Sequence, residues 1–199
     1  MRRPWVVVFF ISFFLAGAGV SLAAGSIPSG KDKAGRVCEA CHGKDGKTAN
    51  ALIPKLEGQQ FDYLVLMLKD FKSGKRKNEQ MAPVSEKLKD ADIEDLAAYY
   101  SSLKPPVEQS DPVLAAKGKG KFETCQECHG VTGEGQGGIP RIGGQHADYL
   151  AGQINAYRNN SRPNIIMSNF VKELTDDEIK AVAAYAAGLK KIPSLQEKK

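Results

Sequence analysis

All four cysteines of this 199-residue chain lie in two copies of one five-residue motif. Residues 38–42 read CEACH and residues 125–129 read CQECH, so the two copies begin 87 residues apart. Because the chain has no other cysteine, whatever these thiols bind is bound once in each half of the protein. We therefore expect a fold built around two equivalent sites.

The likeness between the two halves extends well beyond these motifs and indicates an internal repeat. The stretch PKLEGQQFDYL (54–64) corresponds to PRIGGQHADYL (140–150), and DADIEDLAAYYSSL (90–103) corresponds to DDEIKAVAAYAAGL (176–189). Corresponding residues in these stretches lie 86 positions apart. The chain therefore contains one structural unit twice.

A short segment rich in proline separates the two copies. It reads KPPVEQSDP (104–112), and its two consecutive prolines end the preceding helix and stiffen the connection. We predict a first domain over residues 24–104, a linker over residues 105–112 and a second domain over residues 113–199.

Both copies show the residue spacing of amphipathic helices. In FDYLVLMLKDFKSG (61–74) apolar side chains recur at helical intervals before a glycine, and ADYLAGQINAYRNN (147–160) repeats this pattern. The closing segment of the first copy carries a similar apolar stripe, formed by Ile93, Leu96, Tyr100 and Leu103. Thr175 and Glu178 form a capping box before the corresponding helix of the second copy, and we expect Asp90 to cap the first. No alternating pattern predicts a sheet, so the expected fold class is all-α.

The first 23 residues have the layout of a secretory signal peptide. Two arginines precede an apolar run from Trp5 to about Val20, and small residues follow. This run is shorter than the roughly 20 apolar residues that span a bilayer, which favours cleavage over an uncleaved anchor. We expect cleavage after Ala23 or Ala24 and export of the remaining chain to the periplasm.

The charge balance argues against a nucleic-acid partner. The full chain has a net charge of +5, and loss of the two leader arginines leaves +3. So mild an excess does not predict nucleic-acid binding. No other segment is long and apolar enough to span a bilayer, although peripheral association with a membrane stays open.

The histidine that follows each cysteine pair decides what the motif binds. In an oxidising compartment two C-x-x-C pairs could form disulfides, redox dithiols or a zinc site. These interpretations leave the histidine unexplained, and zinc ribbons space their pairs only roughly 15–20 residues apart. C-x-x-C-H is the attachment motif of c-type haem. We therefore expect two covalently bound haem c groups, one on Cys38 and Cys41 and the other on Cys125 and Cys128.

The motif histidines are the candidates for the first axial ligand of each haem iron. These are His42 and His129, and only His146 remains in the chain. The residue that corresponds to His146 in the first copy is Gln60, so a ligand role for His146 would break the repeat. We expect His146 to be a partly exposed residue at the start of a helix.

Two methionines are the candidates for the opposite axial position. Met81 and Met167 lie 86 residues apart in polar stretches, KNEQMAP and PNIIMSN, which we expect to be irregular. Met67 lies within a helical pattern and corresponds to Gln153, so we interpret it as filler of the core or the surface. An iron with both axial positions filled favours electron transfer, whereas an open position permits ligand binding or peroxide chemistry.

A proline follows each motif histidine at a similar distance. Pro54 lies 12 residues after His42, and Pro140 lies 11 residues after His129. A ligating histidine usually donates its second ring N–H to a carbonyl or a carboxylate. We therefore expect the carbonyl groups of the two prolines to orient the histidines.

With these motifs in place, each half of the chain resembles a class I cytochrome c. The resemblance rests on C-x-x-C-H near the start, a proline about 12 residues later, a methionine in a loop and a closing amphipathic helix. Two such units in one exported chain resemble the dihaem cytochrome c4 family over nearly the whole mature chain. This resemblance implies two tandem all-α class I cytochrome c domains, each wrapped around one covalently bound haem. It also implies an electron carrier with no substrate chemistry of its own.

The same resemblance implies redox proteins as partners. The family members carry electrons from a quinol-oxidising complex to a terminal oxidase. The haem-binding subunit of flavocytochrome c sulfide dehydrogenase has a similar two-domain organisation, so an electron-accepting subunit of a flavoprotein remains the alternative. A dihaem peroxidase is disfavoured because the two methionines occupy symmetric positions.

One cluster of positive charge lies close to the first candidate methionine. The segment KSGKRKN (72–78) contains Lys72, Lys75, Arg76 and Lys77. Such a run is usually a solvated loop, but basic groups at the edge of a haem could also steer an acidic partner. Both interpretations remain open at the level of the sequence.

Overall fold

The computed structural model describes residues 25–190, so the predicted signal peptide at residues 1–23 lies outside the described residues. The helices are α1 (Ile27–Val37), α2 (Glu39–His42), α3 (Phe61–Lys72), α4 (Ala82–Ser85), α5 (Asp90–Ser102), α6 (Pro112–His129), α7 (Ala147–Arg158), α8 (Ile165–Val171) and α9 (Asp176–Gly188), with a 3-10 helix η1 (Lys44–Gly46). No β-strand occurs in this part of the chain, apart from one isolated bridge between Gln136 and Ile139. The predicted all-α fold class is confirmed.

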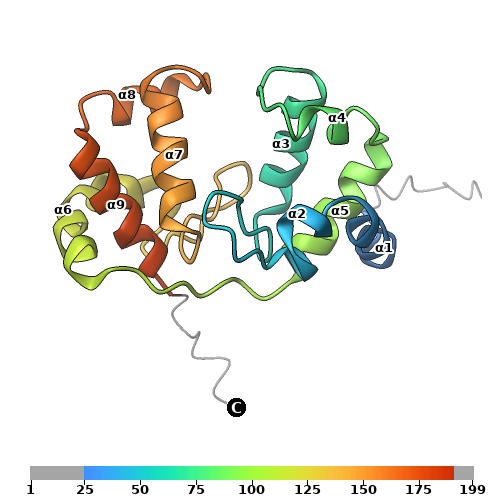
Figure 1. Ribbon diagram of the computed structural model, residues 1–199, viewed down its shortest axis with the longest axis horizontal. Coiled ribbons are helices and arrows are strands. Elements are labelled where there is room, and N and C mark those ends of the chain that lie inside the picture. The colour runs from blue at the N-terminus through green and yellow to red at the C-terminus, as the bar shows by residue number, and fades with distance from the viewer. Residues whose placement is uncertain (1–24, 191–199) are drawn as a thin grey trace, which may run out of the picture.

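The helices form two groups that lie side by side (Figure 1). We call α1 to α5 the N-terminal unit and α6 to α9 the C-terminal unit. In each unit the first helix packs against the last, α1 against α5 and α6 against α9, and the middle helix (α3 or α7) covers the last one. Helices α3 and α7 face each other across the centre of the molecule, and the segment after α5 runs along one edge to α6.

Each unit has its own small hydrophobic core. The N-terminal core consists of Ala34, Leu64, Leu88, Ile93, Leu96, Ala97, Tyr99 and Tyr100. The C-terminal core consists of Phe122, Leu150, Val182, Ala183, Ala186 and Ala187. The predicted stripe on the closing helix is confirmed, because Ile93, Leu96 and Tyr100 are buried and Leu103 packs against them. Cores of this size stabilise a domain only weakly, so a bound apolar group would add substantially to each.

Glycine permits the close crossing of the first and last helices in each unit. Gly30 of α1 lies against the backbone of Asp95, and Gly118 of α6 lies against the backbone of Ala181. A Cβ atom at either glycine would overlap with the facing carbonyl oxygen. The two helices can therefore approach this closely only because the glycines carry no side chain.

The helix starts agree with the sequence in one unit and differ in the other. Thr175 caps α9 and forms the predicted capping box with Glu178. In the N-terminal unit the cap position is Lys89, and Asp90 is already the first helical residue, so the prediction that Asp90 caps this helix is wrong. The Asp92 carboxylate instead accepts a hydrogen bond from the backbone N–H of Lys89. The Asp90 side chain forms an ion pair with Lys72.

The capping carboxylate of α9 predicts an acid-dependent loss of stability. Hydrogen bonds from Lys121 (2.7 Å) and from the Thr175 backbone (2.9 Å) lower the pKa of Glu178 from 4.5 to about 2. Since the pKa is lowered on folding, this carboxylate stabilises the fold above pH 4.5, and the contribution disappears as the pH falls towards 2. Urea unfolding of Glu178→Gln should therefore show a loss of stability at neutral pH that vanishes near pH 2.

Asp177→Asn is the matched control for this measurement. Asp177 is exposed next to Glu178 and makes no ion pair within residues 25–190. We expect the control to unfold like the wild type at every pH. A loss in Glu178→Gln that is equally large at pH 2 and at neutral pH would contradict the assignment.

Among the helices of residues 25–190, none combines the length and the apolar character that a bilayer crossing requires.

Candidate haem sites

The two C-x-x-C-H motifs occupy similar places, although the helices that carry them differ. In the N-terminal unit the helix breaks at Cys38, which ends α1 and begins α2. In the C-terminal unit α6 continues without a break to His129. The first cysteine of each motif packs against its hydrophobic core, and the second, Cys41 or Cys128, is exposed. All four thiols are free, so each pair is available for covalent attachment.

The motif histidines are buried and held by backbone carbonyls. His42 Nδ1 lies 3.0 Å from the carbonyl oxygen of Pro54, and His129 Nδ1 lies 3.0 Å from that of Pro140. A carbonyl only accepts hydrogen bonds, so Nδ1 carries the proton and donates it. This tautomer leaves the Nε2 lone pair of each ring free to bind a metal.

Burial favours the neutral form of both histidines. Burial lowers the pKa of His42 and of His129 below the ordinary value of 6.5. The hydrogen bond to the proline carbonyl raises each pKa, but this effect is smaller than the effect of burial. The rings are therefore neutral at neutral pH, which is the form that binds a metal ion.

The donor set fits haem better than zinc. Within residues 25–190 no group of three or more His, Cys, Asp or Glu side chains converges as a tetrahedral zinc site would require. Each motif instead combines two free thiols with one buried, correctly protonated imidazole. This combination suits thioether attachment of a haem with the histidine as an axial ligand.

The two candidate methionines are held in equivalent backbone settings. The side-chain oxygen of Asn78 accepts a hydrogen bond from the Met81 N–H at 2.8 Å, and that of Asn164 accepts one from the Met167 N–H at 3.0 Å. Both side chains are partly buried. Met81 directly precedes the short helix α4, whereas Met167 lies within α8, so the expectation of an irregular segment is wrong for Met167. Their role as iron ligands stays a prediction.

Met67 is neither core nor free surface. Its Sδ atom lies 3.2 Å from a guanidinium nitrogen of Arg76 and 3.0 Å from one of Arg162. Arg162 belongs to the C-terminal unit, so Met67 contributes to the interface between the units. The interpretation of Met67 as simple filler is therefore incomplete.

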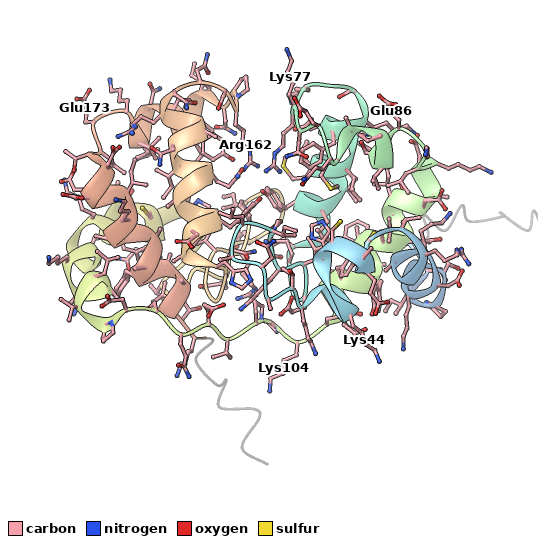
Figure 2. The ribbon with its side chains drawn as sticks, in the orientation of Figure 1. Lys44, Lys77, Glu86, Lys104, Arg162 and Glu173 are labelled. Carbon is pink, nitrogen blue, oxygen red and sulfur yellow. The ribbon has the colours of Figure 1, made fainter. Side chains whose placement is uncertain are left out.

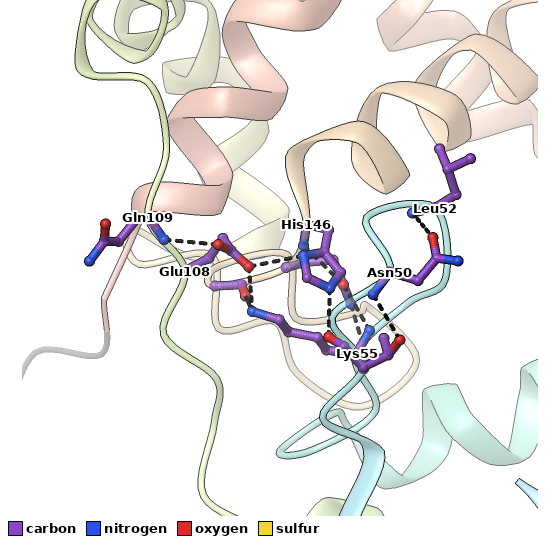
Figure 3. Close-up of polar contacts among 9 residues, drawn as sticks. Asn50, Leu52, Lys55, Glu108, Gln109 and His146 are labelled. Atoms are coloured by element: carbon purple, nitrogen blue, oxygen red, sulfur yellow. Dashed lines mark hydrogen bonds and ion pairs between the residues drawn. The ribbon is translucent and has the colours of Figure 1, made fainter. Parts of the chain in front are cut away.

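His146 also lies at this interface. It occupies the cap position of α7, as expected, but it is only 8% exposed, so the prediction of a partly exposed side chain is wrong. Its Nδ1 atom lies 2.9 Å from Glu108 Oε2, and its Nε2 atom lies 3.0 Å from the carbonyl oxygen of Thr48 (Figure 3). Lys55 forms an ion pair with the same Glu108 oxygen at 2.5 Å. His146 thus joins the first unit, the connecting segment and the second unit.

The interface is reciprocal, as the repeat would require. Gln59 Oε1 accepts from the backbone N–H of Arg141 at 2.7 Å, and Gln59 Nε2 donates to the carbonyl of Arg141 at 3.0 Å. Gln145 makes the corresponding pair of hydrogen bonds to Lys55, both at 2.9 Å. Each unit therefore inserts the same glutamine into the same loop of the other unit. Gln59 and Gln145 were not among the predicted site residues. The occurrence of glutamine at the same position in both copies of the repeat could have indicated their role.

The basic cluster before Met81 is not a free patch. Lys72 and Lys75 form ion pairs with aspartates at 3.0 and 3.4 Å, and Arg76 points into the interface. Neither Arg76 nor Lys77 forms an ion pair within the described part of the chain, and Lys77 points away from the body of the protein (Figure 2). Arg76 is thus turned away from the surface, while Lys75 and Lys77 stay exposed, and the docking hypothesis stays a prediction.

Comparisons with known proteins find a cytochrome c match in each half of the chain. The cytochrome c family matches residues 115–190, and the family of cytochrome c oxidase, cbb3-type, subunit III, matches residues 25–99. Cytochrome c4 of Pseudomonas aeruginosa is 38% identical to this chain over 186 residues, covering 86% of this chain and 92% of that protein.

This chain is also similar to a solved structure and to a protein that is named for the dehydrogenase from which it accepts electrons. The crystal structure of reduced recombinant cytochrome c4 from Pseudomonas stutzeri matches with a TM-score of 0.80 and 37% identity, covering 84% of this chain and 100% of that one. A thiosulfate dehydrogenase electron acceptor of Stutzerimonas stutzeri is 34% identical over 177 residues, covering 80% of this chain and 82% of that protein.

The sites, the repeated fold and the similarities along most of the chain lead to one conclusion. Two cytochrome c units, each with its own C-x-x-C-H motif, account for two covalently bound haem c groups. The chain belongs to the cytochrome c4 family and is an electron carrier.

Proposed function

We propose that this chain carries electrons in the periplasm, between a quinol-oxidising complex and a terminal oxidase. The observation that carries the proposal is the pair of equivalent sites, each with two free thiols and one buried histidine fixed by a proline carbonyl. Two carriers in one chain can accept two electrons in turn. The similarity to cytochrome c4 and the leader-like residues 1–23 support a periplasmic location.

The proposed sites are built from residues of this chain alone. Cys38 and Cys41, and in the second unit Cys125 and Cys128, hold the two haems, which supply reversible one-electron chemistry when bound. The proposed axial ligands are His42 with Met81 and His129 with Met167. The carbonyls of Pro54 and Pro140 fix the proton on Nδ1 of each histidine, which leaves the Nε2 lone pair free to bind a haem iron.

We propose residues 24–104 and 113–199 as the two domains, with residues 105–112 as the linker. The family matches to residues 25–99 and 115–190 lie within these bounds, and each unit has its own core. The linker also carries Glu108, which contacts both units through Lys55 and His146. It therefore contributes to the interface as well as joining the domains.

A second candidate donor is a periplasmic dehydrogenase that oxidises a sulfur compound. The similarity to the thiosulfate dehydrogenase electron acceptor of Stutzerimonas stutzeri favours thiosulfate over the sulfide of the flavoprotein alternative. In this case the chain would take electrons from a separate catalytic subunit, and the two haem sites would be the same.

Reduction of the purified, oxidised protein by native extracts separates these donors. We expect membranes supplied with a quinol to reduce the haems, and periplasmic extract supplied with thiosulfate to leave them oxidised. Reduction by thiosulfate and extract alone would favour the dehydrogenase. Co-elution with flavin at a fixed ratio on a sizing column would favour the flavoprotein, and reduction by neither extract would contradict both carrier assignments.

A further inference from the structure

One buried carboxyl group of the N-terminal unit lacks a partner that such a group normally has. Glu57 lies in the loop between η1 and α3 and is only 5% exposed. Its Oε2 atom is the only buried side-chain oxygen or nitrogen of residues 25–190 without a hydrogen-bond partner. Buried polar groups in proteins are nearly always hydrogen-bonded, and an unpaired one destabilises the fold. Glu57 is therefore a candidate for a functional group.

The loop that carries Glu57 also holds the motif histidine of this unit. Pro54, three residues before Glu57, accepts the hydrogen bond from His42 Nδ1 at 3.0 Å. The backbone N–H of Leu56 donates to the carbonyl oxygen of Gly46 at 3.0 Å, in the turn that follows the motif. Since charges interact strongly where water is excluded, a change of charge at a haem iron bound here acts on a carboxyl group held in this loop.

A pocket connects the surroundings of Glu57 with solvent. The pocket has a volume of about 350 Å³, and Glu57 lines it together with Lys47, Lys55 and Lys104. Lys47 and Lys104 are exposed, and Lys55 is paired with Glu108. A proton can therefore reach Glu57 from solvent without passing through either hydrophobic core.

Burial and the surrounding charges act on Glu57 in opposite directions. Burial raises the pKa of Glu57 above its ordinary value of 4.5, and the charges of Lys55 and Lys47 lower it by a smaller amount. From the C-terminal unit, Arg141 Nε donates to the carbonyl oxygen of Gly58, the next residue, at 2.8 Å. Burial thus favours the neutral carboxylic acid, and the nearby cations favour the carboxylate.

The C-terminal unit has no counterpart of this group. The residue 86 positions after Glu57 is Gly143. A Cβ atom at Gly143 would lie 2.1 Å from the carbonyl oxygen of Thr132, so no longer side chain fits there without a shift of the backbone. The buried carboxyl group is therefore a property of one unit, and the other unit provides an internal comparison.

We propose that Glu57 takes up a proton when the N-terminal haem is reduced and releases it when that haem is oxidised. The electron that enters adds a negative charge, which makes a second negative charge on Glu57 less favourable. The carboxylate then takes one proton from solvent and becomes a neutral carboxylic acid. When the electron leaves for the acceptor, the proton returns to solvent. This rests on the attached haems alone, and not on the proposed methionine ligands, donors or acceptors.

Redox titrations of the native protein at a series of pH values test this coupling. Because the reduced state binds the additional proton, a rise in pH disfavours reduction. We expect one of the two potentials to fall with rising pH over a range that begins above pH 4.5, the value from which burial raises the pKa of Glu57. Glu57→Gln should remove most of this dependence and leave the other potential unchanged.

Glu86→Gln is the matched control for this substitution. Glu86 is an exposed carboxylate of the same unit, on the outer surface of the protein (Figure 2). We expect this variant to titrate like the wild type. Glu57→Gly, which gives the loop the residue of the second copy, takes the place of Glu57→Gln if the latter does not fold.

Infrared difference spectra between the reduced and the oxidised protein observe the proton directly. Reduction should add the C=O band of a carboxylic acid in the wild type and in Glu86→Gln, but not in Glu57→Gln. An unchanged pH dependence in Glu57→Gln, an equal loss of pH dependence at both haems, or a band that survives the substitution would overturn the proposal. Each of these results leaves the uptake of two electrons per chain intact, so it is distinct from a failure of the carrier function.

Discussion

Met81→Ala is expected to convert the N-terminal haem to a high-spin form that binds carbon monoxide, while the C-terminal haem stays low-spin. Removal of the thioether opens one axial position, and loss of thioether ligation lowers the reduction potential of that haem. The expected stoichiometry is one carbon monoxide per chain with two haems. Absorbance spectra of the reduced variant with and without carbon monoxide measure it directly.

Met167→Ala should give the same result at the other haem, and the double variant should bind two molecules of carbon monoxide. Met67→Ala is the matched control, because the Met67 Sδ atom lies against the two arginines at the interface. It should bind no carbon monoxide. A spectrum and a titration of Met81→Ala identical to those of the wild type would contradict the ligand assignment.

Gly118→Ala is expected to destabilise the C-terminal unit by about 3 kcal/mol. The new methyl group would overlap with the carbonyl oxygen of Ala181, which belongs to the backbone of α9 and cannot move aside as a side chain could. Relief of the overlap requires α6 and α9 to separate, which opens the core around Phe122. Denaturant unfolding, followed by circular dichroism, measures the loss.

Gly120→Ala in the same helix is the control for this change. A Cβ atom at Gly120 meets no atom within 4 Å, so the substitution adds only the higher helix propensity of alanine. We expect a gain of roughly 0.5–1 kcal/mol. If both variants showed the same change in stability, the close helix crossing would not be what requires glycine at residue 118.

In the N-terminal unit the sequence predicted α3 and α5, which bury large apolar side chains, and missed α1, which does not. The residues of α3 and α5 recur at helical spacing, and both helices form where the pattern places them. In α1 the buried residues are only Gly30 and Ala34, because this helix packs so closely that larger side chains have no room. A helix that packs through small residues carries no apolar stripe, so periodicity does not reveal it.

The haem-attachment motifs could be predicted from the sequence because covalent attachment requires fixed residue types at fixed spacing. The interface between the two units could not be predicted, because it is made of polar groups that hydrogen-bond to backbone atoms of distant loops. Gln59 and Gln145 show this most clearly, since each reaches a loop some 80 to 90 residues away. Polar residues that are identical in both copies of a repeat would have been the available signal.

The basic segment before Met81 shows where composition misleads. The charges of Lys72, Lys75 and Arg76 are equivalent in the sequence, yet two are paired on the surface and the third is turned into the interface. Only the fold of the following loop distinguishes them. The counterpart Arg162 lies in a stretch without neighbouring lysines and is buried, which its sequence context does not indicate.

The most direct test of the account is an anaerobic reductive titration of the native protein under carbon monoxide. Two haems with both axial positions filled by the chain should take up two electrons per chain, and the spectrum should be the same as without carbon monoxide. Binding of carbon monoxide to either haem, or uptake of a single electron, would contradict a dihaem carrier with histidine and methionine ligands.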